Sequence, residues 1–249
     1  MFTFTEANFE NSIIELFENL GYSHLYGPEV DRDTSNPLLE EQLISSLESI
    51  NPKLPSRAIE EAITKIKNYE AGSLVSKNEF FTDYLQNGVP VTFMHNGVEK
   101  SDIVNLVDYD NPSMNNMAIA NQWTYKEYEV KRPDLVVFLN GIPVVVMELK
   151  SPKADSEVCH IPDRFQVLYQ NYKKSIESFF IYNAFCVISD QSQTKAGTIT
   201  ATIDRFMEWK TVDGDYEETK FADFTTLFKG MFTKTRFLDI LRNFICFSK

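Results

Sequence analysis

Two apolar segments joined by Asn140-Gly141 constrain the fold more than any other feature of this sequence. The segments are LVVFL at 135–139 and IPVVVMELK at 142–150, and both are rich in valine. β-Branched residues favour strands, and an Asn-Gly pair between two such runs is the strongest short-range signal for a β-hairpin. We therefore expect an antiparallel hairpin at 135–150.

Apolar residues at helical spacing occur on both sides of this hairpin. The first predicted helix begins at Thr5, whose hydroxyl can cap it, and ends at Gly21. Residues 37–69 predict two amphipathic helices that Pro52 and Pro55 separate. Further helices are expected at 78–85, at 164–179 and at 221–246, where two helices meet around Gly230.

Strand patterns occupy most of the remaining chain. They lie at 22–30, 89–95, 102–110, 118–130 and 184–190. Strands that are interspersed with helices in this order predict an α/β domain with a mixed sheet flanked by helices.

A chain of 249 residues is long enough to form one large domain with a buried core. We expect a single domain over 1–249. Its expected parts are a core at about 1–30 and 89–205, a helical insertion at about 36–86 with its amphipathic pair near 36–70, and closing helices at 221–246.

The net charge of the chain is −12. A protein that binds DNA by itself usually carries a basic excess, because phosphate contacts dominate affinity. The acidic balance therefore argues against tight, independent DNA binding. It remains compatible with catalysis on DNA that other parts of an assembly hold.

Cysteine usage and hydropathy narrow the cellular context. Cys159, Cys186 and Cys246 form an odd set without paired spacing, which favours a reducing cytoplasm over a disulfide framework. Neither a CxxC nor an HxxxH pair occurs, so no structural zinc site is expected. No apolar run approaches the ~20 residues of a membrane span, and the N-terminal residues lack the basic region of a signal peptide. We expect a cytoplasmic chain without membrane partners.

The predicted hairpin carries Asp134, Glu148 and Lys150, whose spacing is that of a metal-dependent nuclease site. Glu148 and Lys150 are two positions apart on one strand, so their side chains share a face. Two adjacent carboxylates are hard oxygen ligands suited to Mg²⁺, which keeps several waters and bridges to phosphate. The ion would activate a water molecule, and Lys150 could hold that water and balance charge at the phosphate. The carbonyl of Leu149 could be a further ligand.

Asp134 joins the other two residues only if the hairpin is irregular. A regular two-residue turn sets Asp134 opposite Met147 and sends Glu148 to the other face. A three-residue loop, or one bulge, pairs Leu139 with Pro143 and sets Asp134 directly opposite Glu148. The nuclease interpretation therefore requires a longer loop or a bulge in this hairpin.

The spacing by itself is weak evidence for a nuclease. The same E-x-K pattern starts at Glu129, Glu208 and Glu218, and Asp204 precedes Glu218 by the same 14 positions that separate Asp134 from Glu148. Charges that end an apolar strand are normally solvated. The alternative interpretation is therefore an ordinary strand end, and the strand–turn–strand context is what favours a site.

The chain resembles the N-terminal region of the restriction (R) subunit of type I restriction-modification enzymes over nearly its whole length. Segments spread along the chain carry this resemblance, and together they are far more specific than the three site residues. They are LLEEQLISSLESINPKLP, FFTDYLQNGVPV, VDYDNPSMNNMAIANQWTY, KRPDLVVFLNGIPVVVMELKSP, the NYKKSI…YNAFCVISD run and FKGMFTKTRFLDILRNFICF.

The resemblance implies a restriction-endonuclease-like PD-(D/E)xK fold and cleavage of double-stranded DNA. It implies that Asp134 and Glu148 bind Mg²⁺, for which Mn²⁺ could substitute, and that Lys150 is catalytic. It also favours Glu10 over Glu15 as an extra carboxylate ligand, although a solvated helix face is the alternative for both.

The resemblance further implies a larger assembly around this chain. In that family the domain precedes an ATP-driven motor, and modification and specificity subunits complete an enzyme that uses ATP, Mg²⁺ and S-adenosylmethionine. No G-x-x-x-x-G-K-[ST] phosphate loop occurs in this sequence, so the motor would lie in regions beyond it.

One feature departs from the family pattern. The family often has a Gln-x-x-x-Tyr motif on the helix after the E-x-K strand, and Tyr172 matches its tyrosine. Leu168 stands at the glutamine position, with Gln166 and Gln170 on either side. Gln166, Tyr172 and Lys153 are the candidate DNA contacts, and plain surface is the alternative for each. Other basic residues with that same alternative are Arg164, Lys173 and Lys174.

Two rival hypotheses stay open at this point. The chain could be a catalytically silent docking domain that couples the motor to the other subunits, which predicts no metal at Asp134 and Glu148. It could also be a stand-alone nuclease similar to Holliday-junction resolvases, which predicts cleavage of branched DNA by the chain alone.

Overall fold

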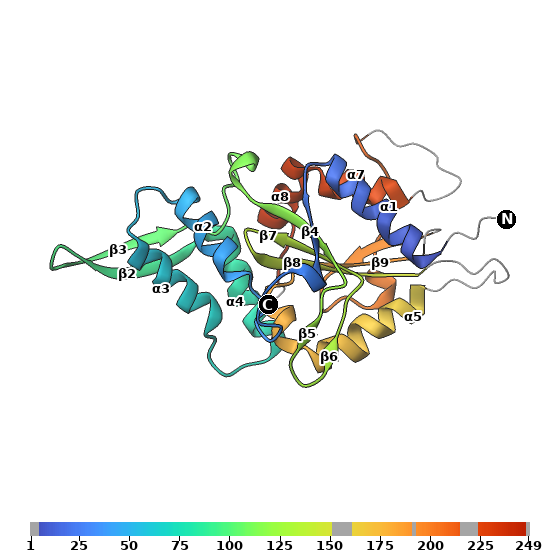
Figure 1. Cartoon of the computed structure of the whole chain (residues 1–249), viewed down its shortest axis with the longest axis horizontal. Helices are drawn as coiled ribbons and strands as arrows, with labels where there is room; N and C mark the ends of the chain where they lie inside the picture. The colour runs from blue at the N-terminus through green and yellow to red at the C-terminus, as the bar shows by residue number, and fades with distance from the viewer. Residues whose placement is uncertain (1–4, 151–160, 191–192, 215–223, 248–249) are drawn as a thin grey trace.

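A six-stranded mixed sheet forms the centre of the molecule (Figure 1). The computed structural model describes residues 5–150, 161–190, 193–214 and 224–247. The strand order is β1-β4-β7-β8-β9-β10; β1 runs parallel to β4 and β8 parallel to β9, while the other neighbours are antiparallel. The strands are β1 (Ser23–Tyr26), β4 (Met117–Asn121), β7 (Leu135–Leu139), β8 (Ile142–Leu149), β9 (Phe185–Ser189) and β10 (Thr194–Gly197). The predicted α/β class with a mixed sheet is confirmed.

Helices α1 (Glu6–Asn19), α7 (Phe224–Phe232) and α8 (Lys234–Asn243) cover one face of this sheet (Figure 1). Helix α1 begins where the sequence predicts, because the Thr5 hydroxyl accepts the N–H of Asn8 and the Asn8 side chain accepts the N–H of Thr5. The face of α1 that carries Phe9, Ile13 and Phe17 is buried. This helix therefore packs firmly against the sheet through that face.

The other face is covered by a helical segment that changes its winding. It runs from α5 (Ile161–Gln166) through a π-helical stretch, η3 (Val167–Tyr172), into α6 (Lys173–Ser175), and a 3-10 helix, η4 (Glu177–Tyr182), follows. The sequence predicts one continuous helix at 164–179. That prediction is right about the helical nature of the segment and wrong about its regularity.

The insertion packs beside the sheet, at the left of Figure 1. It contains α2 (Glu40–Ile50), α3 (Ser56–Lys67) and α4 (Leu74–Asn87), as the sequence predicts. The hairpin of β2 (Val89–His95) and β3 (Val98–Val104) forms its own two-stranded sheet, and β2 packs on α3. Both of these strands were expected in the core, so the hairpin lies with the insertion and outside the central sheet.

Three predicted boundaries are wrong in detail, and one strand was missed. The strand expected at 102–110 lies at 98–104. The strand expected at 118–130 is three pieces, because after β4 the chain forms the short pair β5 (Tyr125–Lys126) and β6 (Val130–Lys131). The closing helices separate at Thr233, whereas Gly230 lies inside α7. Strand β10 was not predicted at all, because its sequence TKAG lacks an apolar alternation.

The central hairpin combines a tight turn with a bulge. Asn140 and Gly141 have φ angles of 52° and 82°, so the loop has two residues and Leu139 pairs with Ile142. The pairing then shifts between Val137 and Phe138, which leaves Val144 as the extra residue. The predicted irregularity is thus confirmed as a bulge. The predicted pairing of Leu139 with Pro143 is wrong, because the bulge lies farther from the turn.

Contacts with the insertion explain why the turn itself stays tight. The Leu39 N–H donates to the Gly141 carbonyl at 2.9 Å, and a Cβ at Gly141 would lie 2.6 Å from the Leu39 oxygen. The Asn140 side chain is fully buried and donates to the carbonyl oxygen of Leu106. A longer loop would break these contacts, so the extra residue is accommodated within β8.

Candidate active site

The bulge places Asp134 and Glu148 together at one end of the central sheet. Leu135 pairs with Met147, so the next position of the ladder sets Asp134 opposite Glu148. An Asp134 carboxylate oxygen accepts the N–H of Leu149 at 2.7 Å, which ties the start of β7 to the end of β8. The structure therefore brings together the two carboxylates that the sequence analysis paired.

Glu148 lies in a closed environment. Its side chain is only 2% exposed, and its Oε2 atom is 3.5 Å from Nη1 of Arg164 on α5. Its Oε1 atom is buried and has no hydrogen-bond partner within the described part of the chain. A buried carboxylate oxygen without a partner is costly, so this atom is a candidate ligand for a cation.

Burial and mutual repulsion disfavour the charged forms of this pair. Desolvation raises the pKa of Asp134 to about 6, Glu6 and Glu10 add to the rise, and the Leu149 N–H opposes it. The pKa of Glu148 is raised well above its usual range, first by burial and then by the Asp134 charge. A bound divalent cation would reverse this balance, because it stabilises both carboxylates in their charged form.

Lys150 follows directly after β8 and reaches toward helix α1. Its Nζ atom is 3.3 Å from a carboxylate oxygen of Glu6, and the Lys150 N–H donates to the Ser189 carbonyl. Its side chain is 29% exposed. Lys150 is thus a partly accessible cation at the same end of the sheet as the carboxylate pair.

A hydrogen-bonded chain attaches Glu10 to the sheet. The Asn121 side-chain amide donates to Glu10 at 2.7 Å, and its Oδ1 atom is 2.9 Å from Nε2 of His24. Glu10 and Asn121 are both buried. No linear pattern singles out Asn121, because nothing in the sequence shows that α1 lies beside the end of β4.

Two of the three candidate DNA contacts lie in the described part of the chain, and these two differ in their exposure to solvent. Tyr172 is buried, and its hydroxyl donates to the Arg132 carbonyl and lies against Glu148, where it opposes the rise in the pKa of that carboxyl. Gln166 is exposed. Lys153 lies outside the described residues. The π-helical winding of η3 changes the angular spacing of side chains, so an α-helical projection does not locate the glutamine of the family motif.

The residues present fit Mg²⁺ better than a softer ion. Asp134 and Glu148 offer carboxylate oxygens, and one of these is buried and unpaired. Among the described residues, no group of three or more His, Cys, Asp or Glu side chains is arranged to hold a metal ion. Glu10 therefore completes no three-carboxylate cluster. Mg²⁺ tolerates such a site, because it commonly takes one or two carboxylates and fills its other positions with water and phosphate.

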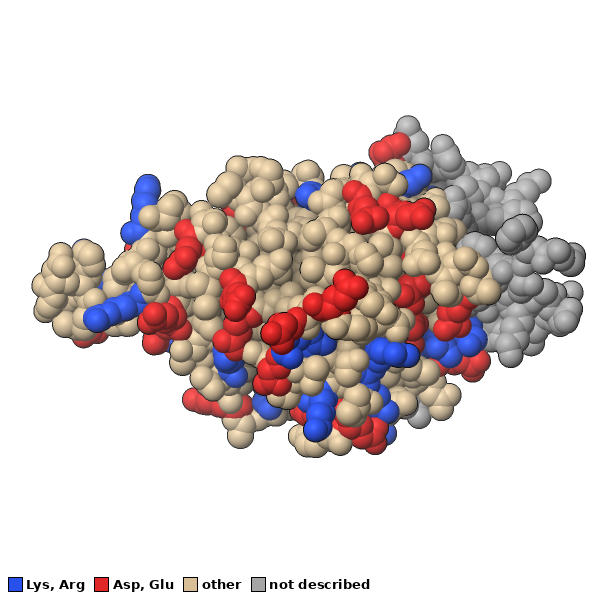
Figure 2. Space-filling model, viewed as in Figure 1, with Lys and Arg blue, Asp and Glu red and all other residues tan. Residues whose placement is uncertain are grey.

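The surface charge agrees with the acidic composition. On the face in Figure 2, acidic and basic side chains are interspersed, and the Lys and Arg side chains of the described residues form no continuous stripe there. A basic stripe is the usual electrostatic sign of a protein that holds DNA by itself. No helix in the described ranges is long and apolar enough to cross a membrane.

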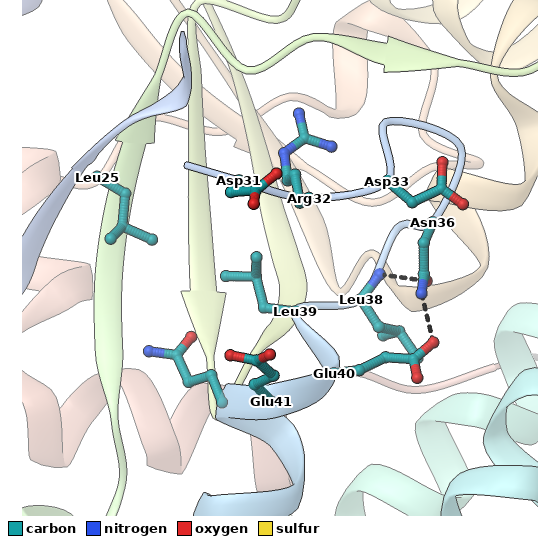
Figure 3. Close-up of a pocket in the computed structure, with 10 residues that line it drawn as sticks. Leu25, Asp31, Arg32, Asp33, Asn36, Leu38, Leu39, Glu40 and Glu41 are labelled. Atoms are coloured by element: carbon teal, nitrogen blue, oxygen red, sulfur yellow. Dashed lines mark hydrogen bonds between the residues drawn. The ribbon is translucent and has the colours of Figure 1, made fainter. Parts of the chain in front are cut away.

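A cavity of about 540 Å³ is lined by residues other than the carboxylate pair; Figure 3 shows these lining residues. It is bordered by β1, the segment 31–39 and the start of α2. None of the nuclease candidates lines it; its residues are Leu25, Asp31, Arg32, Asp33, Asn36, Leu38, Leu39, Glu40, Glu41 and Gln42. The Arg32 guanidinium is stacked on Trp123 at 3.7 Å, and its Nε and Nη1 atoms are buried without a hydrogen-bond partner in the described part of the chain. The cavity does not belong to the candidate active site.

Comparison with known proteins identifies a family. The family described as "Type I restriction enzyme R protein N terminus" matches residues 3–205. Two similar proteins are "Type I restriction enzyme HindI endonuclease subunit" of Haemophilus influenzae and "Putative type I restriction enzyme MjaIXP endonuclease subunit" of Methanocaldococcus jannaschii. Each is 29% identical to this chain; the alignments cover 98% and 96% of this chain, and 24% and 25% of the respective relatives. The chain thus spans about a quarter of the length of these relatives.

Proposed function

Because the chain belongs to the family of type I restriction enzyme R protein N termini, we propose that it is the Mg²⁺-dependent endonuclease domain of such an enzyme and cleaves double-stranded DNA. Its fold would be the restriction-endonuclease-like PD-(D/E)xK fold. The family membership supplies the class of enzyme. The geometry at the end of the sheet supports the chemistry.

One observation carries the proposal. The bulge in β8 sets Asp134 opposite Glu148, and Glu148 then presents a buried carboxylate oxygen without a partner. An ordinary solvated strand end would have neither the burial nor the unpaired oxygen. A purely structural role would not account for this buried and unpaired carboxylate oxygen. A role in binding a cation accounts for it.

Asp134, Glu148 and the carbonyl of Leu149 would hold the Mg²⁺ ion. The N–H and C=O of a strand residue point toward the same neighbouring strand, so the Leu149 carbonyl lies on the side where its N–H meets Asp134. When bound, the ion would supply Lewis-acid stabilisation of the charge that develops on the phosphate. Glu10 would act near this site through its charge.

Lys150 would act on the substrate side. Its ammonium group is partly exposed and pairs with Glu6, which is itself 44% exposed. A partly exposed ion pair of this kind is weak. Lys150 can therefore exchange Glu6 for a DNA phosphate at a small cost in free energy. Lys150 would then orient the attacking water and balance the negative charge of the phosphate.

The larger assembly remains part of the proposal. The modification and specificity subunits would deliver the DNA, while ATP and S-adenosylmethionine would act in parts of the enzyme outside this chain. The net charge of −12 supports this division, because the chain lacks the basic excess of an independent DNA binder. Gln166 and Lys153 stay candidate DNA contacts.

The test uses the complete R subunit that contains this chain, assembled with its modification and specificity subunits. Asp134→Ala, Glu148→Ala and Lys150→Ala should each abolish DNA cleavage and leave ATP hydrolysis largely intact. Glu129→Ala, which removes a glutamate from an E-x-K copy outside the site, should keep both activities. Undiminished cleavage in the three site variants would reject the proposal and favour a silent docking domain.

A further inference from the structure

Arg164 on α5 is a charged neighbour of Glu148. Its Nη1 atom is 3.5 Å from Oε2 of Glu148, and its side chain is 19% exposed. Its Nε atom is buried and makes no hydrogen bond in the described part of the structure. A buried guanidinium N–H without a partner is costly, so this donor calls for an acceptor that arrives with a ligand.

The planar guanidinium group of Arg164 presents donors on two different sides. The N–H of Nε and one N–H of Nη2 point along the same edge of the planar group, and Nη1 lies on the far side. Since Nη1 is directed to Glu148, the Nε–Nη2 edge is the part of Arg164 that can receive another group. This edge matches two oxygens of a carboxylate or a phosphate.

The electrostatics of the site select phosphate. A phosphodiester approaching Asp134 and Glu148 must come close to two carboxylates, and Glu6 and Glu10 add their charges nearby. Lys150 offers one cation from the α1 side, and Arg164 offers another from the α5 side. The Arg164 guanidinium, with two donors that can point to a phosphate, would offset the repulsion between this phosphate and the carboxylates on the α5 side of the site. Lys150 would offset it on the α1 side.

We propose that Arg164 is a substrate-binding residue of the nuclease site: Nη1 faces Glu148 while the Nε–Nη2 edge binds a non-bridging oxygen of the DNA phosphate beside the carboxylate pair. This inference rests on the proposed function. It gives Arg164 two separate interactions: an ion pair with the proposed metal-binding carboxylate, and hydrogen bonds to the substrate phosphate.

The experiment compares Arg164→Gln with Arg57→Gln in the complete R subunit that contains this chain, assembled with its modification and specificity subunits. Arg57 is an exposed residue of α3, so the control removes the same charge far from the site. Binding of a short duplex is measured by fluorescence anisotropy with Ca²⁺ in place of Mg²⁺, over a range of salt concentrations. Binding of Mn²⁺ without DNA is measured by electron paramagnetic resonance.

Arg164→Gln should lower duplex affinity by about 10-fold or more, because it removes charge-assisted hydrogen bonds. The slope of log affinity against log salt should fall by about 1, as expected for the loss of one phosphate contact. Mn²⁺ affinity should stay level or rise, because a competing cation leaves Glu148. Arg57→Gln should change none of these values beyond the loss of one distant charge.

Arg164→Lys separates the two roles. Lysine keeps the charge beside Glu148 but lacks the planar fork, so Mn²⁺ binding should resemble that of the unsubstituted chain while duplex binding stays reduced. Duplex affinity of Arg164→Gln equal to that of Arg57→Gln would overturn the inference. A parallel loss of Mn²⁺ binding and thermal stability would also overturn it, because Arg164 would then be structural.

The failure of the proposed function has a different signature. If the unsubstituted assembly binds Mn²⁺ but its duplex affinity is the same with Arg164→Gln as with Arg57→Gln, the role of Arg164 is overturned and the metal site stands. If the assembly binds no Mn²⁺ through Asp134 and Glu148, the proposed nuclease function fails, and the role of Arg164 fails with it.

Discussion

At the scale of single residues, the site is defined by burial more than by sequence spacing. Glu148 belongs to one of several E-x-K patterns, yet it is 2% exposed and faces Asp134, Arg164 and Tyr172. Glu208, in another copy of the pattern, forms an ordinary ion pair with the 63%-exposed Lys210. Identical spacing therefore gives a surface ion pair in one place and a candidate metal site in another.

The charge of Asp134 should destabilise the metal-free protein. The pKa of its carboxyl is raised from 3.8 to about 6, so the stability linked to this group is full below pH 3.8 and is lost as the pH rises through 6. In EDTA at pH 8, Asp134→Asn should increase the free energy of unfolding by about 1–3 kcal/mol. The gain should shrink toward pH 5, as urea denaturation at both pH values would show.

Added Mg²⁺ provides the matched control for this variant. The ion should raise the melting temperature of the unsubstituted chain, because it binds the folded state, and should leave Asp134→Asn nearly unchanged. Equal stabilisation of both proteins would argue against a metal site at Asp134.

Cys186 should be inert toward thiol reagents. It is fully buried in β9, and burial raises the pKa of its thiol to about 12, so almost no thiolate exists at pH 8. Cys246 is exposed. In a Cys159→Ser background, Ellman's reagent should titrate one thiol in the native protein and two in denaturant. Rapid reaction of two thiols without denaturant would contradict the burial of Cys186.

At the scale of elements, helix α1 connects local capping to the site. Its first turn carries Glu6, which pairs with Lys150, and its second carries Glu10, which is bound by Asn121. The sequence predicts this helix and its cap, because Thr5 and the apolar spacing are local signals. Its place beside the ends of β4 and β8 depends on packing, which no local signal contains.

Thr5→Ala should lower the free energy of unfolding by about 1 kcal/mol, since the capping hydroxyl that accepts the Asn8 N–H is lost. Ser12→Ala in the same helix is the control, because the exposed Ser12 hydroxyl bonds only to the Asn8 carbonyl of its own helix. Urea denaturation measures both variants. A Thr5→Ala protein as stable as the unsubstituted chain would show that the cap is not formed in solution.

At the scale of the whole molecule, a single side chain does much to join the insertion to the central sheet. Asn78 of α4 is 3% exposed, and its amide donates to the carbonyls of Ile181 at 2.9 Å and Asn183 at 2.8 Å, next to the start of β9. The insertion also contacts the turn of the central hairpin through Leu39 and Gly141. The site and the insertion therefore share the same two strands, β8 and β9.

Asn78→Ala should destabilise the chain by about 2 kcal/mol, because two buried carbonyl groups lose their donor. Asn87→Ala is the control, since the exposed Asn87 amide bonds only to Asp83. Denaturation should show a lower midpoint for Asn78→Ala and no change for Asn87→Ala. An unchanged midpoint for Asn78→Ala would mean that the insertion is held by other contacts.

The sequence by itself determined the helices, the central hairpin and the set Asp134, Glu148 and Lys150, because helical periodicity, turn chemistry and capping are local properties of a chain. It also required an irregular hairpin without saying which irregularity. Only the tertiary structure decided that the turn stays tight and the bulge lies at Val144, because Leu39 packs against Gly141 and leaves no room for a longer loop. It also brought Arg164 and Glu10 to the carboxylates, since contacts between distant segments follow from how helices cover both faces of a sheet.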